Sequence, residues 1–153
     1  MNFIDTHTHL FLNQFKDDID DVIDIAIRSG ITKMFLPNIN SETTDSMLQL
    51  CEKYPENCFS MMGLHPCDVK KETMEKELLH VEEMLEKEKF IAVGEIGLDL
   101  YWDKTTLEIQ KMAFEFQIEL AKKHKLPIVI HVRDSFLEAI EIVEKLNDEN
   151  LSG

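Results

Sequence analysis

Histidine and acidic side chains recur in this sequence at spacings that suit metal binding. His7 and His9 are separated by one residue, so in an extended segment both imidazoles project to the same side and can reach one ion. Neutral imidazole binds Zn, Mn, Fe or Ni, and a carboxylate such as Glu95 can bridge two ions. A lone His-x-His pair is more often structural. Asp5, just before the pair, either takes part in the site or tethers the strand end.

Further residues of this kind lie close to short apolar runs. His65 follows the third run, Glu95 and Asp99 follow the fourth, and His131 and Arg133 lie at or just past the end of the fifth. The two remaining histidines, His80 and His124, fall within amphipathic stretches instead. Four of the six histidines therefore occupy positions where functional groups collect in α/β proteins.

The elements that must position these residues follow from the hydrophobic pattern. Short runs rich in Ile, Val, Phe and Met alternate with amphipathic stretches, which predicts five β–α units around a parallel sheet. The predicted strands cover residues 2–5, 32–36, 59–62, 90–94 and 127–131. Residues 90–93 and 128–130 are apolar without alternation, which predicts central strands. Parallel strands end at one edge of the sheet, so we expect the candidate residues to converge there.

The predicted helices carry apolar stripes at helical spacing. They cover residues 19–26, 41–53, 74–85, 109–120 and 136–143. Gly30 ends the first of them, and Asp134 is a candidate cap for the last. In the fourth helix the stripe consists of Ile109, Ala113, Phe116 and Leu120, which we assign to the core. No Ser/Gly tract or change in composition marks a second domain.

Composition narrows the functional class. The 153 residues carry 16 Lys and Arg against 30 Asp and Glu, a net charge of −14, which argues against nucleic-acid binding by a broad basic face. A nuclease stays possible because bound cations can supply the positive charge locally. Three cysteines without C-x-x-C spacing predict neither a disulfide framework nor a thiolate zinc site. No apolar run long enough to cross a membrane and no signal peptide is visible, which predicts a soluble cytoplasmic protein without membrane contact.

Four segments together resemble a known family. Residues 4–10 (IDTHTHL), 62–66 (MGLHP), 94–99 (GEIGLD) and 127–133 (PIVIHVR) are similar, in order and spacing, to the TatD-like deoxyribonucleases of the amidohydrolase superfamily. The resemblance covers nearly the whole chain. It implies an α/β fold of the (β/α)8 TIM-barrel type, with a metal-dependent hydrolase site at the carboxyl ends of the strands.

The resemblance also implies roles for individual residues. His7 and His9 are expected to bind one metal ion, Glu95 to bridge two ions, and His131 to bind the second. The cofactors expected are two divalent ions, Mg, Mn or Zn. His65, in the G-L-H-P segment, is expected to contact the substrate near the scissile phosphate, so we place it with Glu95 among the catalytic residues.

Two of the matched residues have open roles. Arg133 either binds phosphate or a strand end as part of the substrate site, or forms a structural ion pair. Asp99 either belongs to the site or caps the following turn. Tyr101 and Trp102, just beyond it, either stack on a nucleobase or pack in the rim.

The sequence departs from the family pattern at its end. The family has a further His in an H-C-F-S-G segment and an Asp in an E-T-D segment, and neither occurs here. We therefore expect residues 1–153 to be the N-terminal part of a single barrel domain, a truncated form with about five of eight β–α units, and the sequence leaves open whether it turns over substrate alone. The alternative is a half-barrel that forms a homodimer through its open sheet edges.

The leading functional hypothesis is metal-dependent cleavage of DNA phosphodiester bonds, at 3′ ends or in single strands. One alternative is hydrolysis of a C–N or ester bond in a small molecule, because related barrels use the same ligand set. The other alternative is a non-catalytic module that binds metal or a partner.

Overall fold

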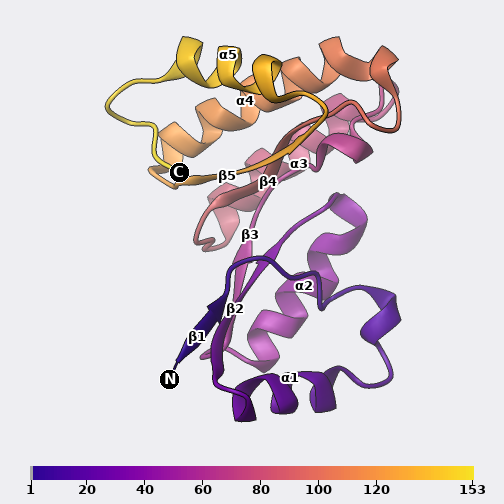
Figure 1. The fold of residues 1–153 in the computed structure, drawn as a ribbon, viewed down its shortest axis with the longest axis vertical. Helices are drawn as coiled ribbons and strands as arrows, with labels where there is room; N and C mark the ends of the chain where they lie inside the picture. The colour runs from indigo at the N-terminus through magenta and orange to yellow at the C-terminus, as the bar shows by residue number, and fades with distance from the viewer. Residues whose placement is uncertain (1) are drawn as a thin grey trace.

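The computed structural model describes residues 2–153 as alternating strands and helices, as the sequence pattern predicts (Figure 1). The strands are β1 (Phe3–Asp5), β2 (Ile31–Pro37), β3 (Cys58–Met61), β4 (Val93–Asp99) and β5 (Ile128–Arg133). The helices are α1 (Ile19–Arg28), α2 (Ser41–Lys53), α3 (Met74–Lys87), α4 (Leu107–His124) and α5 (Phe136–Leu146). Three 3-10 turns are η1 (Asn13–Phe15), η2 (Pro66–Asp68) and η3 (Lys104–Thr106). The α/β class is therefore confirmed.

All strand pairs are parallel, and the strands follow one another in sequence order. One sheet has the order β1-β2-β3, and the other pairs β4 with β5. A parallel bridge between Met62 and Val93 joins the two sheets, with the Gly94 N–H donating to the Met62 carbonyl oxygen at 2.9 Å. The carboxyl ends of all five strands therefore lie on one side of the molecule. The candidate residues were expected to meet on this side.

The helices cover the outer side of the strands. In Figure 1, α1 and α2 accompany β1 and β2 in the lower part, whereas α3, α4 and α5 lie with β4 and β5 in the upper part. Helix α2 begins at the predicted residue because Asn40 and Thr43 form a capping box, in which each side chain bonds the backbone of the other. No helix among residues 2–153 is long and apolar enough to span a membrane.

The fourth strand differs from its prediction. It runs over Val93–Asp99 instead of residues 90–94, and all of its residues are buried. Its two glycines, Gly94 and Gly97, lie in close contact with β5. A Cβ at Gly97, whose φ is 135°, would collide with the carbonyl oxygen of His131 on β5. Glu95 and Asp99 are thus part of the strand and do not follow it.

Two smaller predictions are wrong. Strand β5 pairs only with β4 among the described residues, so it is an edge strand, and Ile130 and Val132 are each 39% exposed. Asp134 does not cap α5: the N-cap residue is Ser135, and its hydroxyl donates to the carbonyl oxygen of Leu98 at 2.8 Å. That bond fixes the start of α5 to strand β4.

Candidate metal centre

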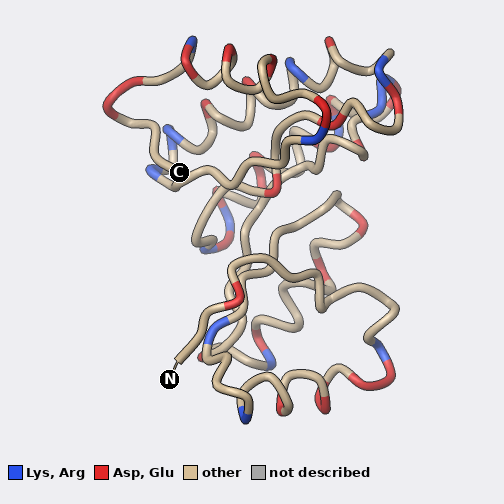
Figure 2. The backbone as a smooth tube through the Cα atoms, viewed as in Figure 1, with Lys and Arg blue, Asp and Glu red and all other residues tan. Residues whose placement is uncertain are grey.

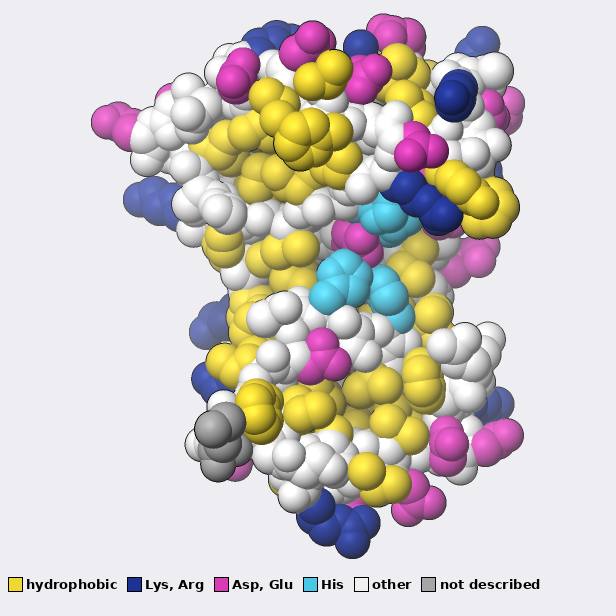
Figure 3. Space-filling model, in the orientation of Figure 1, with side chains coloured by type: hydrophobic (Ala, Val, Ile, Leu, Met, Phe, Trp, Pro, Cys, Tyr) yellow, Lys and Arg dark blue, Asp and Glu magenta, His cyan; other side chains and the backbone are white. Residues whose placement is uncertain are grey.

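The four residues assigned to metal binding converge: His7 and His9 lie just beyond β1, and Glu95 and His131 lie within β4 and β5. Glu95 Oε2 lies 2.9 Å from His7 Nε2 and 3.6 Å from His9 Nε2. Its other oxygen, Oε1, lies 2.8 Å from His131 Nδ1. Figure 3 shows histidine and acidic side chains together in the waist between the two parts of the molecule. Residues far apart in sequence therefore form one cluster around a single carboxylate.

Glu95 occupies an irregular position in β4. The register with β5 shifts between Val93 and Ile96, where three steps along β4 correspond to the two steps from Ile128 to Ile130. Such an extra residue re-aims a side chain relative to the regular pleat. The Glu95 side chain is only 9% exposed, yet it reaches histidines on both sides of the site.

The first pair of histidines is held by the backbone of neighbouring segments. The Thr8 N–H donates to the Phe35 carbonyl oxygen at 3.0 Å, which fixes the segment between His7 and His9 against β2. His9 Nδ1 lies 3.0 Å from the carbonyl oxygen of Pro37. Because a carbonyl only accepts, Nδ1 carries the hydrogen, and the Nε2 of a neutral ring keeps its lone pair for a cation.

Asp5 tethers this segment. Its Oδ1 accepts a hydrogen bond from the His7 backbone N–H at 3.1 Å. The sequence left two roles open for Asp5, and this hydrogen bond corresponds to the tether at the strand end. It sets the direction in which the chain leaves β1 and therefore the position of His7.

His131 lies between two carboxylates. Its Nδ1 is 2.8 Å from Glu95 Oε1, and its Nε2 is 2.8 Å from Asp99 Oδ2. The second oxygen of Asp99 accepts from the Tyr101 backbone N–H at 3.0 Å. Asp99 therefore does both things the sequence left open: it caps the following turn and it orients a site histidine.

His65 is built as a hydrogen-bond donor. The Cys67 backbone N–H donates to His65 Nδ1 at 3.1 Å, so the neutral ring carries its hydrogen on Nε2. That Nε2 points to Glu95 Oε2 at a distance of 3.8 Å. This ring is oriented to donate to an oxygen, whereas His9 is oriented to offer a lone pair.

The cluster controls the charge of its members. Burial by itself raises the pKa of Glu95, but the hydrogen bond from His131 and the nearby His9, His65 and His7 outweigh it and hold the pKa well below the ordinary value. The hydrogen bond to Glu95 raises the pKa of His131 against the effect of burial. Burial lowers the pKa of His65. Glu95 is therefore a carboxylate and His65 a neutral ring.

The donor set fits divalent cations. Two groups have ligand atoms within 4.8 Å of one another, and Glu95 belongs to both. The first group adds His7 and His9, whose Nε2 atoms face each other at 3.3 Å. The second adds His65 and His131. Imidazole and carboxylate suit Zn, Mn and Fe, and a carboxylate with one oxygen towards His7 and His9 and the other towards His131 is suited to bridging.

Arg133 lies at the rim of this cluster and makes no ion pair among residues 2–153. Its guanidinium carbon lies 3.6 Å from the ring centroid of Tyr101. The structural ion pair considered from the sequence is therefore not formed. The basic group stays available at the site edge.

Two buried glutamines on α4 were missed by the sequence analysis. Gln117 accepts from the Leu64 N–H at 2.7 Å and donates to the Leu64 carbonyl oxygen at 3.2 Å. Gln110 bonds both backbone groups of Asp99 in the same way, at 2.8 and 3.0 Å. They fix the segments that carry His65 and Asp99. The signal was a glutamine recurring after seven residues on an otherwise apolar helix face.

The apolar stripe assigned to α4 from the sequence is wrong at one residue. Phe116 is 38% exposed, whereas Phe114 and Ile118 are fully buried beside the glutamines. Ala113 and Leu120 of the assigned stripe are buried. The helix instead turns its glutamines inward, where they bond the backbone around the site.

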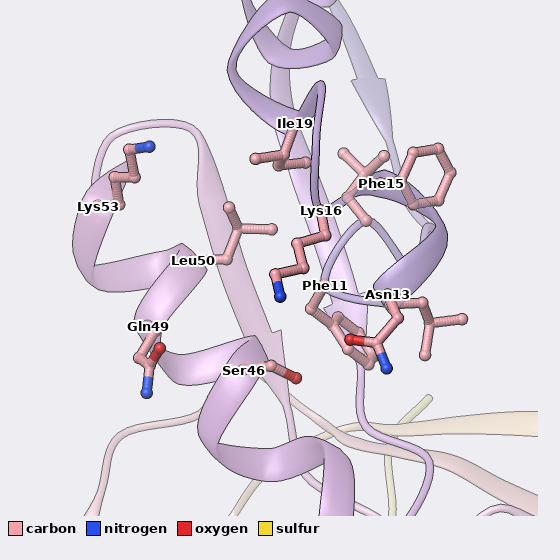
Figure 4. A pocket seen from close by; sticks show the side chains of 11 residues that line it. Phe11, Asn13, Phe15, Lys16, Ile19, Ser46, Gln49, Leu50 and Lys53 are labelled. Carbon is pink, nitrogen blue, oxygen red and sulfur yellow. The ribbon is translucent and has the colours of Figure 1, made fainter.

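A separate cavity of about 330 Å³ lies outside the cluster (Figure 4). It is formed by the segment after β1, the start of α1 and one side of α2, and none of the site histidines lines it. Its labelled side chains include Phe11, Lys16, Ile19, Gln49 and Leu50. We do not include this cavity in the metal centre.

Comparison with known proteins places this geometry in a family. Residues 4–153 match the sequence profile described as TatD related DNase. The chain belongs to the TatD related DNase family. The match confirms the resemblance drawn from the four sequence segments.

Individual family members are similar over nearly all of this chain. The uncharacterized metal-dependent hydrolase YabD of Bacillus subtilis is 34% identical over 97% of this chain and 58% of its own length. The 3′-5′ ssDNA/RNA exonuclease TatD of Pectobacterium carotovorum is 28% identical over 86% of this chain and 50% of its own length. The crystal structure of YjjV, a TatD homologue from Escherichia coli, superposes with a TM-score of 0.86 at 32% identity, over 94% of this chain and 55% of that one. The chain thus spans a little over half the length of these relatives.

Proposed function

We propose that this protein takes part in metal-dependent hydrolysis of phosphodiester bonds in DNA, at a 3′ end or in a single strand. The observation that carries the proposal is the division of Glu95, whose Oε2 faces His7 and His9 while its Oε1 faces His131. Family membership and the nuclease name of one relative support it. The described units would then form the N-terminal part of a single hydrolase barrel domain.

In this proposal His7, His9 and Glu95 hold one divalent ion, and Glu95 and His131 hold the second. Mg, Mn or Zn would supply the polarisation of a phosphoryl oxygen and the activation of a water molecule. The Glu95 carboxylate would set the distance between the two ion positions. His9 offers its lone pair because Pro37 fixes its tautomer.

The substrate contacts come from His65 and Arg133. His65 Nε2 donates a hydrogen bond to a phosphate oxygen, because its other ring nitrogen is already occupied by the Cys67 N–H. Arg133 adds a positive charge at the rim, where the strand end would lie. The His7 side chain is 40% exposed. The nuclease name of the Pectobacterium relative favours DNA over a small amide or ester.

The test begins with the purified chain treated with a chelator. Adding Mn or Mg should restore cleavage of single-stranded DNA labelled at its 5′ end, and metal analysis should find two ions per chain. Glu95→Gln should abolish cleavage and lower the metal content. Glu83→Gln makes the same chemical change at an exposed pair on α3 and should change neither. Cleavage that is unaffected by Glu95→Gln would refute the proposal.

A non-catalytic module that self-associates is the second candidate. The outer strands support it: Phe3 and Ile4 on β1 are 51% and 52% exposed, and Ile130 and Val132 lie on the other edge. Unpaired edges of this kind are sites of strand pairing. Light scattering combined with metal analysis separates the candidates. A homodimer without stoichiometric metal supports the module, and a monomer with two ions supports the hydrolase.

A further inference from the structure

Two aromatic side chains stand beside the metal centre with most of their surface in solvent. Trp102 is 73% exposed and Tyr101 is 53% exposed. Their ring centroids are 4.8 Å apart with the planes at 90°. Both follow directly from the end of β4, which carries Glu95. Neither ring is therefore packed into the rim as a structural residue would be.

A cation accompanies the aromatic pair. The guanidinium carbon of Arg133 is 3.6 Å from the Tyr101 centroid and 5.7 Å from the Trp102 centroid. The chain has a net charge of −14, and Figure 2 shows acidic residues along the outer helices and loops of both parts. Arg133 has no carboxylate partner among residues 2–153, whereas the other arginine, Arg28, pairs with Asp24. Arg133 can accept an anion without first breaking an ion pair.

The aromatic segment is fixed relative to the metal centre. The Tyr101 N–H donates to Asp99 Oδ1, and the other oxygen of Asp99 contacts His131. Further along, Asp103 Oδ1 accepts from both the backbone N–H and the hydroxyl of Thr105, at 2.8 and 2.6 Å. The segment is thus held at both ends by carboxylates, and it presents its rings in a preset position.

A cavity adjoins the exposed tryptophan. It has a volume of about 250 Å³, and Trp102 and Asp99 both line it. Its other walls include Pro66 and Val69, which are apolar, and Lys70 at the surface. The cavity combines an aromatic face and apolar walls with one lysine and the carboxylates of Asp99 and Asp103, and Asp99 also contacts His131.

We propose that Trp102 stacks on one unpaired nucleobase of a single-stranded nucleic acid, while Arg133 binds the adjoining phosphate. This deepens the proposed function and rests on it, because it names the feature of the substrate that the site selects. A base can reach the Trp102 face only when it is not stacked within a duplex. The subsite therefore favours single strands and frayed ends, of any base sequence.

The single tryptophan of the chain makes the proposal measurable without turnover. Short oligothymidylate with phosphorothioate linkages, which resist hydrolysis, is titrated into the protein at low ionic strength with Mg present. The tryptophan emission should be quenched and should saturate, and a blunt duplex of the same length should quench far less. Unchanged emission overturns the proposal, whether or not the oligonucleotide binds elsewhere.

A pair of variants separates stacking from a structural role. Binding of a dye-labelled oligothymidylate, followed by anisotropy, should weaken about tenfold or more for Trp102→Ala and less for Trp102→Phe. Phe3→Ala removes another exposed ring, at the end of β1 that is farther from His7. This variant should bind the oligothymidylate normally. Each variant must keep the wild-type melting temperature, and Trp102→Phe keeps an aromatic ring in place if the alanine variant does not fold.

The strongest test measures the binding of the wild type and of Trp102→Ala to an oligonucleotide that lacks one base. Removing a base next to the 3′-terminal linkage should weaken binding to the wild type about tenfold and should have little effect on Trp102→Ala. Equal losses in both proteins would overturn the stacking. Cleavage by the loaded protein without tryptophan quenching would refute this subsite alone, whereas quenching without cleavage would refute the proposed hydrolysis and leave the subsite intact.

Discussion

The two sides of Glu95 are supported in different ways. On one side, the segment of His7 and His9 is held by carbonyl oxygens of β2, the neighbouring strand. On the other side, His131 is held by two carboxylates, those of Glu95 and Asp99. The side of His7 and His9 therefore includes one ring, His9, whose Nε2 lone pair is free for a cation. The side of His131 instead consists of contacts between one histidine and two carboxylates.

The difference shows how one carboxylate can serve two unlike positions. A backbone carbonyl fixes the tautomer of His9 and adds no charge, so the cation binds to a neutral ligand. The carboxylate beside His131 adds negative charge on the second side, which strengthens the attraction for a cation there. We expect the two ion positions to differ in affinity, and the predictions below test that expectation.

Glu95→Asp should have the largest effect. The shorter side chain keeps the charge but cannot reach both histidine groups, so we expect a metal content of at most one ion and a loss of activity of more than about 100-fold. Metal analysis and a single-strand cleavage assay measure both. Glu83→Asp on the exposed face of α3 is the matched control. Two bound ions in Glu95→Asp would show that its reach does not set their separation.

Asp99→Asn should affect only the second side. The amide loses the charge that faces His131 Nε2, and outer partners of metal ligands typically contribute about 10- to 100-fold in affinity or activity. We expect a loss in this range for the ion at His131 and no change for the ion at His7 and His9. Calorimetric titration with Mn resolves the two affinities. Equal weakening of both ions would contradict the separation of the two sides.

The sequence was sufficient for the order of the elements and for the convergence of the candidate site residues. Alternating apolar runs and helical stripes place the five units, and the capping residues around Asn40 set the start of α2. The limits of β4 could not be read in this way. Its glycines are needed for close contact with β5, and that requirement depends on a strand more than 30 residues later in the chain.

The orientation of the site histidines could not be predicted either. Spacing brings His9 and His65 to the same edge, but it does not tell which ring nitrogen is free. That is decided by the Pro37 carbonyl in one case and the Cys67 N–H in the other. Likewise the two inward glutamines of α4 act on the backbone of distant segments, which a helical pattern does not show.

Gln117→Leu should have the smallest effect, on stability and on the second side alone. The leucine leaves the N–H and carbonyl oxygen of Leu64 without partners in the core, which costs about 1 to 3 kcal/mol of unfolding free energy. Urea unfolding followed by circular dichroism measures this loss. Gln14→Leu, at an exposed position in η1, is the control and should stay within about 0.5 kcal/mol of the wild type.

The same variant also probes the position of His65. Leu64 precedes this residue directly, so a loosened backbone should misplace the donor Nε2 and raise the KM for single-stranded DNA, while the affinity of the ion at His9 stays unchanged. If Gln117→Leu weakened both ions equally, α4 would support the whole cluster. The contrast between the side of His7 and His9, which β2 holds, and the side of His131 and His65, which α4 supports, would then have to be abandoned.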